Sequence, residues 1–258
     1  MTTAFRCVTI LAAIVLVALV LTPTLYGAGT ASPTSMADLT LLNAANRDRA
    51  AAGLPPLQWD GALAAAAHQH ALRMAQMNTL SHQFPGEPPM QDRARRAGAR
   101  FSMIAENVAE GPSVTGLHIQ WMNSPPHRAN LLDKELNSVG ISVVQSGNML
   151  FAVEDFSVAV PSMSLDAQEQ QVQSQLAARG LQVVDATADA RKTCESDHGW
   201  AGQRPAGVMR YETADIRNLP QDIDLRLSSG KYRSAAVGAC EAGGSQDFAR
   251  FRVAILLY

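Results

Sequence analysis

The spacing of apolar residues predicts that the folded part of the chain begins with two helices. Apolar residues recur every three or four positions between Asp38 and Gly53, which predicts an amphipathic helix that Asp38 caps and Gly53 ends. A second, Ala-rich helix is predicted between Asp60, its N-cap, and Asn78. Its buried face is predicted to contain Leu63, Ala67, His70, Met74 and Met77. We therefore expect His70 in the core with one backbone partner, and a cavity-lining position is the alternative.

Two further helices are expected before the pattern changes. Residues 91–97 predict a short helix whose basic side chains, Arg93 among them, are expected to be solvated. Residues 113–124 predict another helix, which Pro125-Pro126 ends because proline removes a backbone donor. His127 is then placed at the end of that helix.

From Val139 onward the apolar residues alternate with polar ones, which is typical of strands. Ser146-Gly147-Asn148 predicts a turn and residues 150–156 predict the returning strand, so a β-hairpin is expected here. Glu154 and Asp155 interrupt the returning strand. An edge or solvent-facing position is the simpler expectation for them, and a cavity-facing position is the alternative. Helices beside a small antiparallel sheet make the fold class α/β.

Val160-Pro161 predicts a boundary between one domain at 36–160 and a small α/β domain at 162–258. The C-terminal domain is expected to contain a helix at 166–179, a strand at 181–184 and alternating segments at 223–227 and 248–257. The dipeptide Val237-Gly238 echoes Val139-Gly140, and chance is a simpler explanation of so short an echo than duplication.

Composition agrees with two globular domains and restricts the choice of partners. The chain has 258 residues, of which 47% are hydrophobic and 17% charged, too apolar a composition for a disordered protein. The net charge is −2, and it becomes −3 if residues 1–31, which contain Arg6 and no acid, are removed. Neither nucleic acid nor an anionic membrane surface is favoured by such a charge.

Residues 1–31 have the pattern of a secretory signal peptide. Arg6 ends a short polar region, an apolar run extends from Cys7 to Leu21, and Gly29-Thr30-Ala31 provides small residues for cleavage. The run is shorter than the roughly 20 apolar residues that cross a bilayer core, so cleavage is favoured over an uncleaved anchor, which stays open. The mature protein is expected to be secreted, extracellular or periplasmic, without a stable membrane span.

Only Cys194 and Cys240 remain after the signal peptide is removed. Exported proteins meet oxidising conditions, so these two cysteines are expected to form one disulfide, with free buried thiols as the alternative. The chain has no CxxC or His-rich spacing of the kind that structural zinc sites use.

Three short motifs in the first domain point to a known family. They are Leu80-Ser81-His82, the segment AENVAEG at 105–111, and the segment WMNSPPHR at 121–128. With further similar stretches at 42–49, 53–60 and 139–141, residues 36–157 resemble the CAP superfamily in its bacterial SCP-like form. The resemblance implies an α-β-α sandwich for this domain. The C-terminal segment resembles no family that we recognise.

The resemblance also implies a polar cavity at which His82, Glu106 and His127 meet. In the family a second acid commonly stands three residues after the tryptophan, where this chain has Ser124. His82 and His127 are the candidate ligands for zinc or a similar divalent metal, because imidazole nitrogens bind such ions. With two imidazoles and no second acid, the expected metal affinity is modest. The alternative is that both histidines only hydrogen-bond across the fold.

Three functions follow from this set of residues, and the first is favoured. The protein is expected to be a secreted binding module for a lipid-like or other small ligand or for an envelope partner, because the family includes such non-catalytic binders. The alternatives are a metal-dependent hydrolase, in which Glu106 accepts a proton, and a non-catalytic cell-envelope interaction protein. Enzymatic activity is not favoured, since the second acid is replaced by Ser124.

Overall fold

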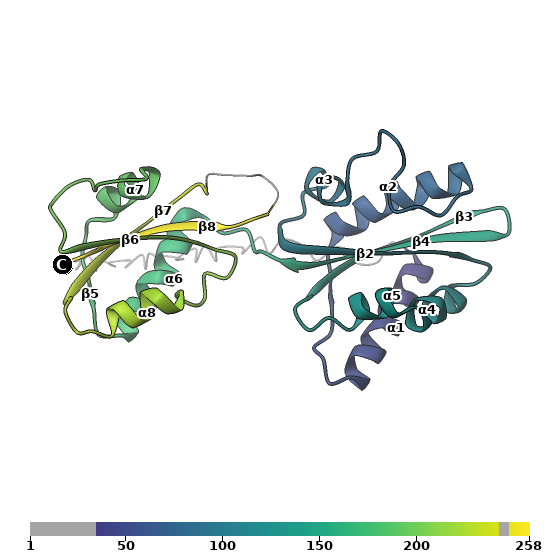
Figure 1. Cartoon of the computed structure of the whole chain (residues 1–258), viewed down its shortest axis with the longest axis horizontal. Coiled ribbons are helices and arrows are strands. Elements are labelled where there is room, and N and C mark those ends of the chain that lie inside the picture. Colours follow the sequence, from purple (N-terminus) through teal and green to yellow (C-terminus); the bar gives the residue numbers. More distant parts are fainter. Residues whose placement is uncertain (1–34, 243–247) are drawn as a thin grey trace, which may run out of the picture.

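The computed structural model describes residues 35–242 and 248–258, and these residues form two units, each with its own four-stranded sheet (Figure 1). The signal peptide predicted at 1–31 lies outside the described residues. Among the helices that the structure describes, none combines the length and the apolar character needed to cross a membrane.

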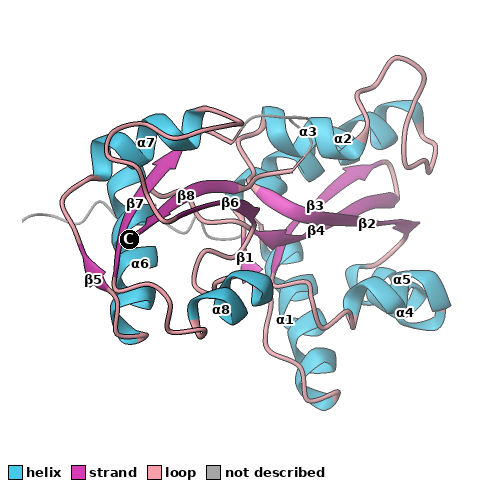
Figure 2. Cartoon of the chain, turned by 60° about the vertical axis from the view of Figure 1, so that its left-hand side comes forward, coloured by secondary structure: helices cyan, strands magenta, loops and turns pink. Residues whose placement is uncertain are grey.

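The first unit is an α-β-α sandwich. Its sheet has the order β1-β3-β4-β2, in which β1 is parallel to β3 and the other neighbours are antiparallel. Helices α2 and α3 cover one face, and α1, α4 and α5 cover the other (Figures 1 and 2). The elements are α1 (Met36–Ala51), β1 (Gln58–Trp59), α2 (Gly61–Met77), α3 (Met90–Arg96), β2 (Phe101–Gly111), α4 (Val114–Asn123), α5 (Pro125–Leu131), β3 (Ser138–Ser146) and β4 (Met149–Ala159). The predicted fold class is confirmed, with a sheet that is mixed because of the short β1.

The first two helices begin at polar caps. Asp60 accepts from the backbone N–H groups of Ala62 and Leu63, as predicted for the start of α2. The predicted Asp38 cap of α1 was wrong by three positions. Ser35 is the N-cap and Asp38 is its partner in a capping box, an arrangement that the sequence S-x-x-D could have suggested.

The β3–β4 hairpin is confirmed, but the expected edge position of Glu154 and Asp155 was wrong. Strand β4 lies between β3 and β2, and both acids are fully buried on it. The error arose because the strand that follows α3 could not be identified from periodicity. That strand is β2, which lies at the edge of the sheet and pairs with β4.

Proline also misled the prediction around His127. Pro125 and Pro126 end α4, but Pro125 is also the first residue of α5, where a missing N–H costs nothing. His127 therefore lies in the first turn of a new helix. His118 on α4 is buried, and its Nε2 lies 2.7 Å from Asp48 Oδ2 on α1.

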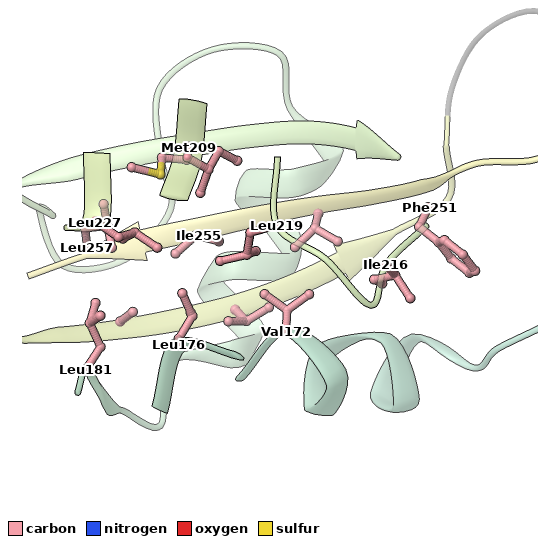
Figure 3. Packing of buried hydrophobic residues seen from close by; sticks show 14 of the residues in the cluster. Val172, Leu176, Leu181, Met209, Ile216, Leu219, Leu227, Phe251, Ile255 and Leu257 are labelled. Carbon is pink, nitrogen blue, oxygen red and sulfur yellow. The ribbon is translucent and has the colours of Figure 1, made fainter. Parts of the chain in front are cut away.

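The second unit has a sheet of order β5-β7-β8-β6, with α6 and α8 on one face and α7 on the other (Figure 1). Its elements are α6 (Leu165–Ala178), β5 (Gln182–Val183), α7 (Thr187–Glu195), β6 (Gly207–Thr213), α8 (Gln221–Leu227), β7 (Ser234–Cys240) and β8 (Phe251–Leu257). Figure 3 shows its core between the sheet and α6, to which Val172, Leu176, Ile255 and Leu257 contribute.

Residues 223–227 form a helix, which corrects the strand-like alternation predicted there. The apolar residues Ile223, Leu225 and Leu227 alternate with charged ones in the sequence, but only Ile223 and Leu227 are buried and Leu225 is exposed. Ile223 and Leu227 are also four positions apart, which places them on one face of the short helix α8. Five residues are too few to distinguish the period of a strand from that of a helix.

The predicted disulfide is confirmed. Cys194, in the last turn of α7, is bonded to Cys240 at the end of β7. The bond ties α7 to the face of the sheet that it covers, and it lies entirely within the second unit.

The two units meet through a small set of contacts near β2. Ala249 N donates to Phe101 O at 2.7 Å. The rings of Phe101 and Phe248 meet edge to face, with centroids 6.1 Å apart. We predict that residues 36–160 fold without the C-terminal unit.

Candidate functional site

His82 lies in the loop that follows α2. The loop begins where Asn78 takes a left-handed conformation, with φ 45°, and ends the helix. The side chain of His82 is 60% exposed, and its Nδ1 lies 2.8 Å from Glu106 Oε1. This hydrogen bond to Glu106 raises the pKa of His82 above 6.5. With Nδ1–H donating to the carboxylate, Nε2 is the nitrogen available to a ligand.

Glu106 is held on β2 by a second partner, Arg93 on α3. The guanidinium of Arg93 donates to Glu106 Oε2, and both side chains are buried. Arg93 also donates to His82 O at 3.2 Å. Arg93 therefore joins the helix, the strand and the histidine loop.

The prediction that Arg93 is solvated was wrong. A basic residue on a short helix is normally exposed, and only a carboxylate across the fold makes its burial tolerable. The sequence did not show that this cation would pair with Glu106.

His127 reaches the site from α5, which two asparagines fasten to β2. Asn107 Nδ2 donates to His127 O at 3.1 Å, and Asn130 Nδ2 donates to Asn107 Oδ1 at 2.9 Å. Burial lowers the pKa of His127, and the neighbouring His82 lowers it further. His127 is thus a neutral imidazole at neutral pH. Asn107 and Asn130 are site residues whose contacts the sequence did not reveal.

Ser124 joins α4 to α5. It is the N-cap of α5 without a side-chain hydrogen bond, and its backbone N–H donates to Gln120 O. Of the predicted cavity residues, the structure therefore brings His82 into contact with Glu106 and places His127 near them. It gives Ser124 a position at the junction of α4 and α5.

Two buried acids lie behind the site on β4. Asp155 pairs with Glu106 across the β2–β4 ladder, and burial raises its pKa well above the usual range, with the Glu106 carboxylate adding to the effect. Burial raises the pKa of Glu154 to about 8. Glu154 is therefore mainly neutral at pH 7, and burial favours the neutral form of Asp155 as well.

A second histidine pair fixes the loop that carries His82. His70 is fully buried on α2, its Nε2 lies 2.7 Å from Ser81 O, and its Nδ1 lies 2.8 Å from Glu87 Oε1. The predicted core position of His70 is confirmed, and the predicted backbone partner is Ser81 O. Glu87 was missed because it stands in a Pro-rich loop whose path the sequence does not determine.

The donor set at the site fits weak metal binding better than a closed metal centre. A metal-bound histidine usually donates its other N–H to a carboxylate, as His82 does to Glu106. Within residues 35–242 and 248–258, however, no group of three or more His, Cys, Asp or Glu side chains is placed to hold a metal ion. His82 and His127 would have to share the ion with water or with a ligand.

Comparison with known proteins agrees with this geometry. Residues 42–158 match the cysteine-rich secretory protein family, CAP. The first unit is therefore a CAP domain and belongs to this family, as the motifs predicted.

Individual relatives match the same region of the chain. YkwD of Bacillus subtilis, an uncharacterized protein, is 29% identical over 123 residues, which are 46% of this chain and 48% of YkwD. YlbC of Bacillus subtilis, an uncharacterized membrane protein, is 32% identical over 108 residues, 40% of this chain and 30% of YlbC. The chain thus spans about half or less of the length of these two relatives.

Solved structures give a similar picture. An extracellular SCP-domain protein from Bacillus anthracis has 27% identity and a TM-score of 0.43, over 49% of this chain and 45% of that one. An outer surface protein from Borrelia burgdorferi has 20% identity and a TM-score of 0.46, over 50% of this chain and 96% of that one.

Proposed function

We propose that this protein is an exported CAP-domain binding module, and that His82 and His127 hold a small polar ligand or a divalent ion such as zinc. The observation that carries the proposal is the exposed imidazole of His82, fixed by a buried Glu106–Arg93 pair. An imidazole whose Nδ1 is hydrogen-bonded to a buried carboxylate, and whose Nε2 is free, is suited to binding.

Three independent features support export. Residues 1–31 have the signal-peptide pattern, and the chain contains a Cys194–Cys240 disulfide of the kind that persists in oxidising compartments. The similar proteins from Bacillus anthracis and Borrelia burgdorferi are described as extracellular and as an outer surface protein.

Binding is favoured over hydrolysis because Glu106 is already engaged. One oxygen interacts with His82 and the other with Arg93, so this carboxylate is poorly placed to take a proton from a bound water. An envelope interaction protein whose site only supports the fold is the remaining alternative. Loss of ligand binding on changing His82 or His127 separates the binding module from that alternative.

Zinc titration by calorimetry tests the polar site. We expect wild type to bind about one zinc ion with modest affinity, and His82→Ala and His127→Ala to bind it about tenfold more weakly or not at all, since each removes an imidazole ligand. Affinity should fall as the pH is lowered through the raised pKa of His82, above 6.5, because protonated imidazole does not bind metal.

His198→Ala is the matched control, because His198 is an exposed histidine of the second unit. Its heats should equal those of wild type. Equal heats in all four proteins would rule out the His82–His127 site.

A different observation favours a lipid-like ligand at a second site. A pocket of about 390 Å³ lies between the two units, and such a volume is in the range of small-molecule sites, which often occur at domain interfaces. Most of its lining is apolar, with a few polar groups at hand: Asn137, Val158, Ala159, Pro161, Met163, Gln171, Ala214, Asp215, Ile216, Arg217 and Phe251. We propose this pocket as the place for the hydrocarbon part of an amphipathic ligand.

Dodecanoate serves as the probe for this pocket. Ala214→Phe should weaken dodecanoate binding about tenfold or more by filling the pocket, whereas Ala97→Phe, at an exposed position after α3, should leave it unchanged. His82→Ala should also leave it unchanged, which keeps the two sites distinguishable. Equal binding by wild type and Ala214→Phe contradicts the proposal.

A further inference from the structure

The second unit repeats the architecture of the CAP domain in the same chain order. In both units a first helix is followed by a two-residue strand, a second helix, a long strand, helical structure and a closing hairpin. The strand orders, β1-β3-β4-β2 and β5-β7-β8-β6, become identical when β1, β2, β3 and β4 are replaced by β5, β6, β7 and β8.

The strand directions repeat as well. The two-residue strands β1 and β5 are each parallel to the first hairpin strand, β3 or β7. The long strands β2 and β6 are each antiparallel to the second hairpin strand, β4 or β8. The helices also take equivalent faces, because α2 and α7 lie on one side of their sheets while α1 and α6 lie on the other (Figure 1).

One glycine in each unit has the same packing role. A Cβ on Gly140 of β3 would lie 2.0 Å from Ala64 N and 2.2 Å from Leu63 C, in the first turns of α2. A Cβ on Gly238 of β7 would lie 2.1 Å from Arg191 N and 2.2 Å from Ala190 C, in the first turns of α7. In both units a helix backbone therefore rests directly on a strand backbone, at the same strand of the same sheet order.

We infer that the second unit is a shortened copy of the CAP fold, so that the chain contains two such modules in tandem. The echo of Val139-Gly140 in Val237-Gly238 is then part of this repeat, which corrects its attribution to chance. The family match ends at residue 158 because the second copy keeps the glycine and the topology without the other motifs.

The repeat gives Glu106 of the candidate site a counterpart. Along the ladders, Gly140 pairs with Asp155, which pairs with Glu106. In the second copy, Gly238 pairs with Ala254, which pairs with Arg210. The position of the candidate acid is thus occupied by an arginine.

Arg210 has a structural role that Glu106 does not share. Its guanidinium donates to Thr193 O at 2.8 Å and to Gly199 O at 2.6 Å, so it fastens the segment between α7 and β6 to the sheet. A divalent cation is disfavoured beside this fixed positive charge. The second copy has kept the fold without the His82–Glu106 pair, so the proposed cation site of the first copy has no equivalent at this position.

Alanine at each glycine of the full-length chain tests the repeat. Gly238→Ala should strongly reduce the protection from amide hydrogen exchange in α7, β7 and β8 while the CAP domain keeps its own. Gly140→Ala should do the same to α2, β3 and β4. Gly147→Ala is the control, because its Cβ would meet nothing within 4 Å at a φ of +58°, so only backbone strain is added.

Wild-type protection in Gly238→Ala would overturn the inference, because α7 could not then rest on β7 at that glycine. If either variant fails to fold, nuclear Overhauser contacts in the wild-type chain decide. The repeat requires parallel pairing of Gln182 with Ser234 and of Val183 with Ala235. Any other pairing of this strand overturns it, whatever the ligand of the first copy is.

Discussion

Arg93→Met is expected to destabilise the CAP domain by about 3–5 kcal/mol, because it leaves the carboxylate of Glu106 buried without its cation. The side chains of Arg93 and Glu106 are 6% and 4% exposed, so water does not replace the lost partner. Urea unfolding followed by tryptophan fluorescence measures the change, since Trp121 is fully buried in the core of this domain.

Two further variants make the experiment specific. Arg96→Met, at an exposed position of the same helix, should change the free energy of unfolding by less than about 0.5 kcal/mol. Arg93→Met combined with Glu106→Gln should be more stable than Arg93→Met alone, because no unpaired charge remains buried. Equal stability of Arg93→Met and Arg96→Met would show that the pair does not hold the site together.

Removing the disulfide is expected to cost the second unit about 4 kcal/mol, because the bond closes a loop of 46 residues in the unfolded chain. The double variant Cys194→Ala and Cys240→Ala avoids leaving one free thiol. Chemical reduction of wild type should lower the stability of the second unit by a similar amount. Calorimetry should show a lower transition temperature for this unit only.

The CAP domain is the internal reference for that measurement, since Cys194 and Cys240 both lie outside it. Its transition should not move when the disulfide is removed. If both transitions shift together, the two units unfold as one cooperative body, and the predicted boundary at Val160-Pro161 does not separate independent domains.

The parts of the fold that could be predicted from sequence are those with a strong local signal. The helix that Asp60 begins and the β3–β4 hairpin were predicted because capping and strand periodicity act within a few residues. Strand β2 could not be identified in the same way. The residues at one end of β2 contact solvent, and those at the other end lie between helices and β4. No single period of apolar residues therefore describes the strand.

The site was predicted only as far as its motifs extend. His82, Glu106 and His127 stand in sequences that resemble the family, and the structure brings the first two into contact. Arg93 was wrongly predicted to be solvated. The identity of the cation that meets a buried acid depends on how α3 crosses β2. Local sequence does not contain that information.

The second unit was predicted least well because its elements are short. Residues 223–227 give too few positions to define a period, whereas the strand predicted at 181–184 is confirmed as β5. Gly238 was the informative residue of this unit, because a glycine is needed where α7 approaches β7. A single glycine becomes interpretable only when the helix that rests on it is known.

The fastening of the His82 loop has a consequence for the thermodynamics of binding. His70 holds Ser81 O, and Glu87 Oε2 accepts from Phe84 N at 2.9 Å, so the chain on both sides of His82 is anchored to buried groups. A ligand that meets His82 therefore has little loop motion to arrest, and the entropic cost of ordering the receptor is small. A substitution of the buried residue His70 would let the His82 loop move. It would thereby alter the affinity for the ligand without removing a ligand contact.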